Sequence, residues 1–307
     1  MTRGIYITAN DKVIEQAIAL LNSIRYYDRE TPIMLIPYDD NYGEIAQILT
    51  EKYNVKIYRD LNFIERLSQK LYDLFGEGFF ARPNQFRKQA CWFGEFDEFL
   101  YIDTDIVVFE KIIDNLNHLQ DYDFLCCDYQ HAGGIRNVFA KDIIEKGVFT
   151  EQETQDIFNC GFWASKKNLL SEQDLYDVFG ECAAHPEYFD FSHKTSDQPI
   201  INYMILTRVN KRLNLVKKPE GKGAGSWGGS KHFQRQGNIL IDTNTNQPLQ
   251  YIHWAGIKIK PGCPYWDIWK HYRYLNESDP PKDPPIWQNN FQKIFQQVKT
   301  NIKNKLK

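Results

Sequence analysis

Compact apolar runs alternate with longer mixed stretches through the first hundred residues of the chain. The runs predict strands at residues 4–8, 33–37, 55–58 and 98–102. The stretches between them predict helices at residues 13–24, 43–53, 62–75 and 84–95, with Asp11 as the candidate N-cap of the first. Strands that alternate with helices predict an α/β fold with a Rossmann-like, mostly parallel sheet and helices on both faces. Ligands of such sheets bind beyond the carboxyl ends of the strands.

The second half of the chain is less regular. Strands are predicted near residues 122–126, 158–164, 213–216 and 249–254, and helices near 171–182 and 197–206. Five glycines between Gly221 and Gly229 predict a mobile loop, with Trp227 inside it. Four prolines between Pro280 and Pro285 end the compact body. The predicted organisation is therefore one domain over residues 1–278, a Pro-rich linker over 279–285 and a C-terminal helix over 286–307.

The C-terminal segment carries an apolar face and many basic residues. The apolar face consists of Phe291, Ile294, Phe295, Val298, Ile302 and Leu306, and the positive charge comes from Lys293, Lys299, Lys303, Lys305 and Lys307. A basic amphipathic helix of this kind can lie on an anionic membrane surface. A helix docked on its own domain fits the same pattern, so both interpretations stay open.

Composition and charge narrow the function classes. The formal net charge of −3 provides no basic field for nucleic acid. None of the six cysteines forms a CxxC pair, which argues against a zinc or dithiol site and favours a reducing interior. No apolar run approaches 18 residues, and the N-terminal run is too short for a signal peptide. We therefore expect a cytoplasmic protein, with peripheral membrane contact through its C-terminal helix as an open alternative.

Two carboxylates stand between hydrophobic runs in the segment Phe99 to Phe109. Asp103 and Asp105, separated by Thr104, follow a predicted strand and precede another apolar run. Acids at such a place are costly unless something pairs with them. A divalent cation does so, because hard oxygen ligands suit Mg²⁺ and Mn²⁺, and the cation can stabilise a diphosphate leaving group. An acidic surface turn is the plainer alternative.

Two further segments carry polar groups that suit a nucleotide. Thr8 to Asp11 follow the first strand and open the first helix, where backbone amides and small polar side chains can hold a base, ribose or phosphate. Helix capping by Asp11 explains the same residues. Near the C-terminal end, His253 precedes Gly256, Lys258 and Lys260. These lysines can meet the phosphates that a metal meets, although a lone histidine is more often structural.

Taken together, six segments in order resemble the retaining glycosyltransferases of family 8, the glycogenin and lipopolysaccharide galactosyltransferase group, which have a GT-A fold. Thr8-Ala9-Asn10-Asp11 resembles their nucleotide loop, Lys88 to Trp92 their Lys-x-x-Cys-Trp helix, and Asp103-Thr104-Asp105 their DxD motif. Phe158 to Gly161 resembles their FNxG strand, Ser196-Asp197-Gln198 their DQ pair, and His253 to Gly256 their HxxG segment. The resemblance covers most of residues 4–261.

The resemblance implies roles for these residues. Asp103, Asp105 and His253 would hold Mn²⁺ (or Mg²⁺) against the diphosphate. Thr8, Asn10 and Asp11 would contact the uridine, with Ala9, Thr104 and Gly256 in the same nucleotide-sugar site. Lys88 would steady the donor, Asn159, Asp197 and Gln198 would bond the transferred sugar, and Lys258 or Lys260 would meet the phosphates. Asp128 is a further candidate for the sugar hydroxyls. Two departures stand out, because Val13 replaces a common Tyr and Lys260-Pro261 comes one residue late.

The implied reaction is metal-dependent transfer of a hexose from a UDP-sugar to a hydroxyl acceptor with retention at the anomeric carbon. Saccharide, lipid-linked and protein acceptors all stay open. An inverting GT-A enzyme, with Asp197 or Asp128 as the base, is one alternative, and an inactive nucleotide-sugar-binding protein is another. A phosphohydrolase with an aspartate nucleophile is disfavoured, because that class usually places its DxD after the first strand.

Overall fold

A computed structural model describes residues 1–126, 138–189, 196–217, 224–279 and 281–282 of the chain. Asp128 and the amphipathic segment 286–307 lie outside the described residues. Across the described ranges, every helix is too short or too polar to span a bilayer. The domain boundary near residues 279–285 and the membrane contact therefore stay predictions.

A seven-stranded sheet forms the centre of the fold, in the order β3-β2-β1-β4-β7-β6-β8. Its strands are β1 (Arg3–Ala9), β2 (Ile33–Pro37), β3 (Lys56–Ile57), β4 (Glu98–Ile102), β6 (Phe124–Cys126), β7 (Phe162–Lys166) and β8 (Arg212–Asn214). Within this described sheet, β7 alone runs antiparallel to its neighbours, and every other adjacent pair is parallel. The predicted α/β fold with a mostly parallel sheet is confirmed.

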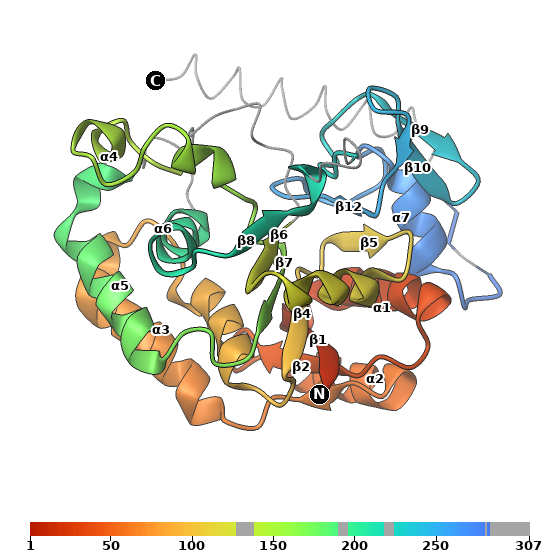
Figure 1. Cartoon of the computed structure of the whole chain (residues 1–307). Helices are drawn as coiled ribbons and strands as arrows, with labels where there is room; N and C mark the ends of the chain where they lie inside the picture. The colour runs from red at the N-terminus through yellow and green to blue at the C-terminus, as the bar shows by residue number, and fades with distance from the viewer. Residues whose placement is uncertain (127–137, 190–195, 218–223, 280, 283–307) are drawn as a thin grey trace, which may run out of the picture.

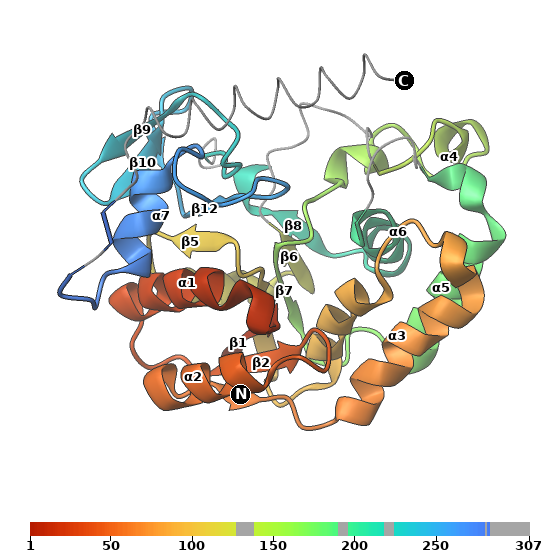
Figure 2. The same cartoon turned by 180° about the vertical axis from the view of Figure 1, so that it is seen from behind.

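Helices cover both faces of this sheet (Figures 1 and 2). One face carries α1 (Ile14–Tyr27), α2 (Gly43–Tyr53) and the 3-10 helix η4 (Ile112–Gln120). The other carries α3 (Leu61–Phe75), the 3-10 segment η3 (Pro83–Phe93), α5 (Glu172–Ala184) and α6 (Gln198–Arg208). Successive strand residues face opposite layers. Accordingly, Ile5 and Ile7 of β1 join the cluster with α1, whereas Tyr6 joins the cluster with η3.

Some predicted elements differ in detail from the structure. The segment predicted as a helix at 84–95 is a 3-10 segment, whose buried positions three and four apart suit either helix type. The strand predicted at 158–164 begins at Phe162, because Asn159 folds back to accept a hydrogen bond from the Gly161 amide. Asn10 caps the short η1 (Asp11–Val13) ahead of α1, so the predicted Asp11 cap of the first helix is wrong.

A smaller β region packs beside the main sheet and was largely unpredicted. β5 (Ile106–Val108) pairs antiparallel with β12 (Tyr251–His253), and β9 (Phe233–Gln236), β10 (Ile239–Asp242) and β11 (Gln247–Pro248) form a second small sheet. Helix α7 (Trp266–Arg273) joins this region to α1 through a third hydrophobic cluster. The remaining short helical elements are η2 (Gly76–Gly78), α4 (Asp142–Glu145), η6 (Glu153–Asp156), η7 (Pro186–Tyr188) and η8 (Leu215–Lys217).

Candidate active site

A cleft of about 710 Å³ opens at the carboxyl ends of β1, β2 and β4, where an α/β sheet is expected to bind its ligands. Its wall is completed by the residues before β7, the start of α6 and the segment after β12. Of the residues that the sequence nominated, it contains Thr8, Ala9, Asn10, Lys88, Asp103, Thr104, Asp105, Asn159, Asp197, Gln198, His253, Gly256 and Lys258. All six segments that carry the resemblance therefore converge on one cavity.

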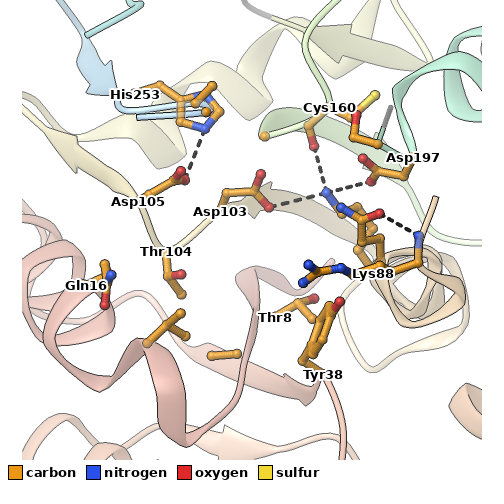
Figure 3. Close-up of a pocket in the computed structure, with 18 of the residues that line it drawn as sticks. Thr8, Gln16, Tyr38, Lys88, Asp103, Thr104, Asp105, Cys160, Asp197 and His253 are labelled. Carbon is orange, nitrogen blue, oxygen red and sulfur yellow. Dashed lines mark hydrogen bonds and ion pairs between the residues drawn. The ribbon is translucent and has the colours of Figure 1, made fainter. Parts of the chain in front are cut away.

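The DTD segment meets His253 because of strand pairing. Asp103 follows the end of β4, and its amide donates to the Gly161 carbonyl at 2.8 Å. Asp105 directly precedes β5, whose partner β12 ends at His253 in register with Ile106. The His253 Nε2 atom consequently lies 3.1 Å from Asp105 Oδ1 (Figure 3). Ligand atoms of Asp103, Asp105 and His253 all lie within 4.8 Å of one another.

This donor set fits a divalent cation. Two carboxylates and one imidazole suit Mn²⁺ better than Mg²⁺, which prefers oxygen ligands throughout. Gly161 leaves the room that such an ion requires. A Cβ at that position would come within 2.3 Å of His253 Cε1 and 2.8 Å of Asp103 Oδ2. The structure thus fits the metal role that the sequence resemblance implied for these three residues.

Asp105 and His253 shift the pKa of each other. Burial raises the pKa of a carboxyl group and lowers that of an imidazole, so it opposes charge on both. The attraction between the Asp105 carboxylate and the His253 imidazole outweighs burial, holding the pKa of Asp105 below and that of His253 above the usual values. A metal cation bound to His253 would displace the imidazole proton and attract the Asp105 carboxylate in its place.

Lys88 connects the metal candidates to the second half of the site. Its Nζ atom lies 2.8 Å from Asp197 Oδ2 and 3.3 Å from Asp103 Oδ1, and it donates to the Cys160 carbonyl (Figure 3). The same Nζ atom lies 4.8 Å from the centre of the Tyr101 ring, and the Tyr101 hydroxyl donates a hydrogen bond to Asp103. Burial alone would lower the pKa of Lys88, but the two carboxylates raise it well above its usual value. Lys88 is therefore a buried cation that neutralises two acids.

The residues resembling the family's sugar contacts also converge. Asn159 uses its side-chain oxygen to accept from the Gly161 amide at 2.9 Å and donates its amide to Gln198 Oε1 at 3.4 Å. Asn202 fixes the backbone just before them, bonding both the amide and the carbonyl of Phe158. This wall of the cleft offers amide donors and acceptors at fixed positions.

Two nominated residues lie elsewhere. Asp11 does not line the cleft, because its carboxylate accepts the Ile45 amide at 2.8 Å and so serves the first turn of α2. Lys260 also lies outside the cleft lining, whereas Lys258 belongs to it. Of the two lysines that the sequence resemblance nominated for the phosphates, Lys258 is thus the one that reaches the cleft.

Several cleft residues were not nominated from the sequence. They are Lys12, Val13, Gln16, Tyr38, Asp39, Arg82, Gln85, Tyr101, Cys160, Gly161, Ser196, Ala255, Ile257 and Ile259. Tyr38 and Asp39 follow β2, so the strand-end rule applied to β1 and β4 could have found them. Asp39 also accepts a hydrogen bond from Asn10 at 2.7 Å. Arg82 and Gln85 gave no comparable signal, because they stand at the start of η3 and not at the end of a strand.

Comparisons with known proteins agree with this geometry. A family model described as "Mannosyltransferase putative" matches residues 2–123, and no curated protein matches the chain. The galactosyltransferase LgtC, solved with donor and acceptor sugar analogues, aligns with a TM-score of 0.59 at 13% identity, over 93% of this chain and 99% of LgtC. The fold is that of the GT-A glycosyltransferases.

The bifunctional glycosyltransferase WbbM, solved without ligand, aligns with a TM-score of 0.55 at 14% identity over 89% of this chain. The match covers 49% of WbbM, so the chain spans about half the length of that protein. The enzyme class predicted from the sequence, a glycosyltransferase, is thus the class of the matched family model and of both structures.

Proposed function

We propose that this protein transfers a hexose from a UDP-sugar to a hydroxyl acceptor with retention of anomeric configuration. The donor would lie along the cleft, with its nucleoside near Thr8, Ala9 and Asn10 at the end of β1. Its diphosphate would lie between the metal candidates and Lys258, and its hexose near Asn159 and Gln198.

One observation carries the proposal most directly. The three candidate metal ligands stand in the same cleft as Lys88, which bridges Asp103 to Asp197. A purely structural histidine or an acidic surface turn would not be expected to meet a buried lysine and an amide-lined wall. Perturbed ionisable groups that gather in one cleft are typical of active sites.

Mn²⁺, held by Asp103, Asp105 and His253, would supply a Lewis acid that lowers the basicity of the departing diphosphate. Lys258 would add a positive charge to the same leaving group. In the transfer, the acceptor oxygen bonds to the anomeric carbon while the bond from that carbon to the phosphate oxygen breaks. Its electron pair leaves with the diphosphate, and the acceptor proton passes to a phosphate oxygen.

The ion pair of Asp197 argues against one of the two residues, Asp197 and Asp128, that an inverting enzyme was expected to use as its base. An inverting enzyme needs a free general base near the acceptor. The Asp197 side chain is 7% exposed and its Oδ2 lies 2.8 Å from the Lys88 ammonium, so this carboxylate is held in an ion pair and is not free to approach an acceptor. Attack from the same face as the leaving group needs no such base, because the diphosphate itself accepts the proton.

The name of the matched family model raises a second donor class. A mannosyltransferase description favours a mannose donor, and GDP-mannose is therefore the main competitor to a UDP-hexose. The cleft lining provides polar groups for either uracil or guanine. A hydrolysis assay with both donors therefore separates them.

The test is Mn²⁺-dependent hydrolysis of a panel that contains UDP-glucose, UDP-galactose, UDP-N-acetylglucosamine and GDP-mannose. We expect one donor to be turned over by the native protein and Asp105→Ala to abolish that turnover. Asp177→Ala, which removes an exposed acid from α5, is the matched control and should leave it unchanged. Full turnover by Asp105→Ala would refute the metal assignment. Binding of nucleotide without any hydrolysis would favour the inactive protein, and NMR of a transfer product would separate retention from inversion.

A further inference from the structure

The described part of the glycine-rich loop, residues 224–230, is tied to β12 by two backbone hydrogen bonds. The amide of His253 donates to the Ser226 carbonyl at 2.7 Å, and the amide of Gly228 donates to the His253 carbonyl at 2.7 Å. The segment therefore adds a short parallel bridge to β12, on the edge opposite β5, with Trp227 and His253 as partners. An added Cβ on Gly228 would make a tight contact of 3.1 Å with Trp254 Cδ1, and one on Gly229 would collide with the Trp227 ring.

Trp227 stands out in this segment because its neighbours Ser226 and Gly228 are buried whereas its own side chain is 37% exposed. Bridge partners on adjacent strands direct their side chains to the same face, with the strands about 4.8 Å apart. The indole of Trp227 therefore lies on the face that carries the imidazole of His253. The candidate metal site lies on this face, and Trp227 stands just outside the residues that line the cleft.

The orientation of the indole is fixed from two sides. Its Nε1–H donates to the carbonyl of Ala255, a residue of the cleft wall, at 3.1 Å. A Cβ on Gly229 would lie 2.4 Å from Trp227 Cζ2, so the glycine provides the space against which the ring rests. A partly exposed aromatic ring that is already held in place loses little conformational entropy when a ligand covers it.

We propose that Trp227 is an acceptor-binding residue on which a pyranose ring of the acceptor stacks. The C–H bonds on one face of a pyranose present a weakly positive edge, and the π face of an indole is negative. This inference rests on the proposed glycosyltransferase function.

The position of Trp227 matches the acceptor better than the donor. The groups nominated for the nucleoside come from the end of β1, and those for the transferred hexose come from the segment before β7 and from the start of α6. Trp227 lies on neither side but next to His253, beyond β12 (Figure 3 shows His253 apart from Thr8 and from Asp197). Attack on the leaving-group face brings the acceptor hydroxyl to the diphosphate and hence to this flank of the metal site.

The experiment titrates the full-length protein, with Mn²⁺ present, with the methyl pyranosides of glucose, galactose and mannose. Binding is followed by saturation-transfer NMR and by tryptophan fluorescence, and UDP and GDP are titrated in parallel. We expect Trp227→Ala to weaken pyranoside binding by roughly tenfold or more, as truncation of a central aromatic contact does. Trp227→Phe should retain most of the affinity, and Gly229→Ala should weaken it by displacing the ring. Tyr26→Ala, which removes another exposed aromatic ring, is the control and should have no effect.

Equal pyranoside affinity in the native protein and in Trp227→Ala would overturn the inference, as would the absence of pyranoside binding to the native protein at high millimolar concentration. A loss of nucleotide affinity in Trp227→Ala without a loss of pyranoside affinity would assign the ring to the base instead. Thermal unfolding of each variant identifies misfolding. Failure of the proposed function is seen separately, as the absence of Mn²⁺-dependent donor hydrolysis by the native protein.

Discussion

Replacing Lys88 by Met should destabilise the fold and not only the reaction. The Lys88 side chain is 7% exposed, and its ammonium lies 2.8 Å from Asp197 Oδ2 and 3.3 Å from Asp103 Oδ1. At an effective dielectric constant of about 20, the shorter contact alone corresponds to roughly 6 kcal/mol of attraction before desolvation is subtracted. The contact with Asp103 counts for less, because that side chain is about a third exposed and partly screened by solvent.

The net loss should lie near the measured cost of breaking a buried ion pair by removing one partner, about 3–5 kcal/mol. For a domain of this size that corresponds to a fall in the unfolding midpoint of roughly 5–8 °C. The assay is thermal or urea unfolding of the metal-free protein. Lys88→Arg, which keeps the charge, should lose much less, and Lys146→Met, at a surface pair with Glu187, should show no measurable shift.

The pH dependence of this deficit provides an independent check. Burial already holds the pKa of Asp197 above the unfolded value of about 3.9 against the attraction of Lys88, and loss of the Lys88 charge should raise that folded-state pKa further. A carboxyl group with a raised folded-state pKa lowers stability as pH increases through the window between the two values. The deficit should therefore be smaller near pH 5 than near pH 8. A loss below about 1 kcal/mol, or a deficit that grows on acidification, would refute the role of Lys88 as the neutralising cation.

Three further predictions concern the cleft itself. Gly161→Ala should reduce the Mn²⁺ affinity measured by calorimetry by at least roughly tenfold, because the added Cβ would collide with His253. The control Gly180→Ala has open space around its Cβ and should keep the native affinity. Equal Mn²⁺ affinities of Gly161→Ala and the native protein would contradict the proposed ion position. The Mn²⁺ affinity should fall as the pH drops through the raised pKa of His253, because only the neutral imidazole binds a metal ion. An Mn²⁺ affinity that stays constant between pH 8 and pH 6 would exclude His253 as a ligand. In initial-rate assays, Lys258→Ala should raise the donor KM by roughly tenfold, whereas Lys260→Ala should leave it unchanged. A raised donor KM in Lys260→Ala but not in Lys258→Ala would assign the phosphate contact to Lys260.

The family-level assignments from the sequence have unequal standing. The α/β fold and the glycosyltransferase class agree with the structure and with the comparisons. Membership of family 8, the UDP-sugar donor and retention remain proposals. The candidate Asp128 and the segment 286–307, which was predicted as a C-terminal helix, lie outside the described residues.

The sequence by itself determined the strands and helices of the first hundred residues and the position of Asp103 and Asp105 at a strand end. These features follow from local periodicity, which a chain carries in the spacing of its own apolar residues. The same rule would have given Asp39 at the end of β2. It could not give β5 or the β9–β11 sheet, whose short segments are stabilised by partners distant in the chain.

Only the tertiary structure decided how the site is assembled. The pairing of β5 with β12 sets His253 against Asp105, and the packing of η3 under the sheet inserts Lys88 between two acids. Packing also turned Asp11 toward α2 and fixed Trp227 beside His253. The reason is physical: hydrogen bonds and charge contacts between segments far apart in the chain depend on register and burial, and neither is encoded in the spacing of any single segment.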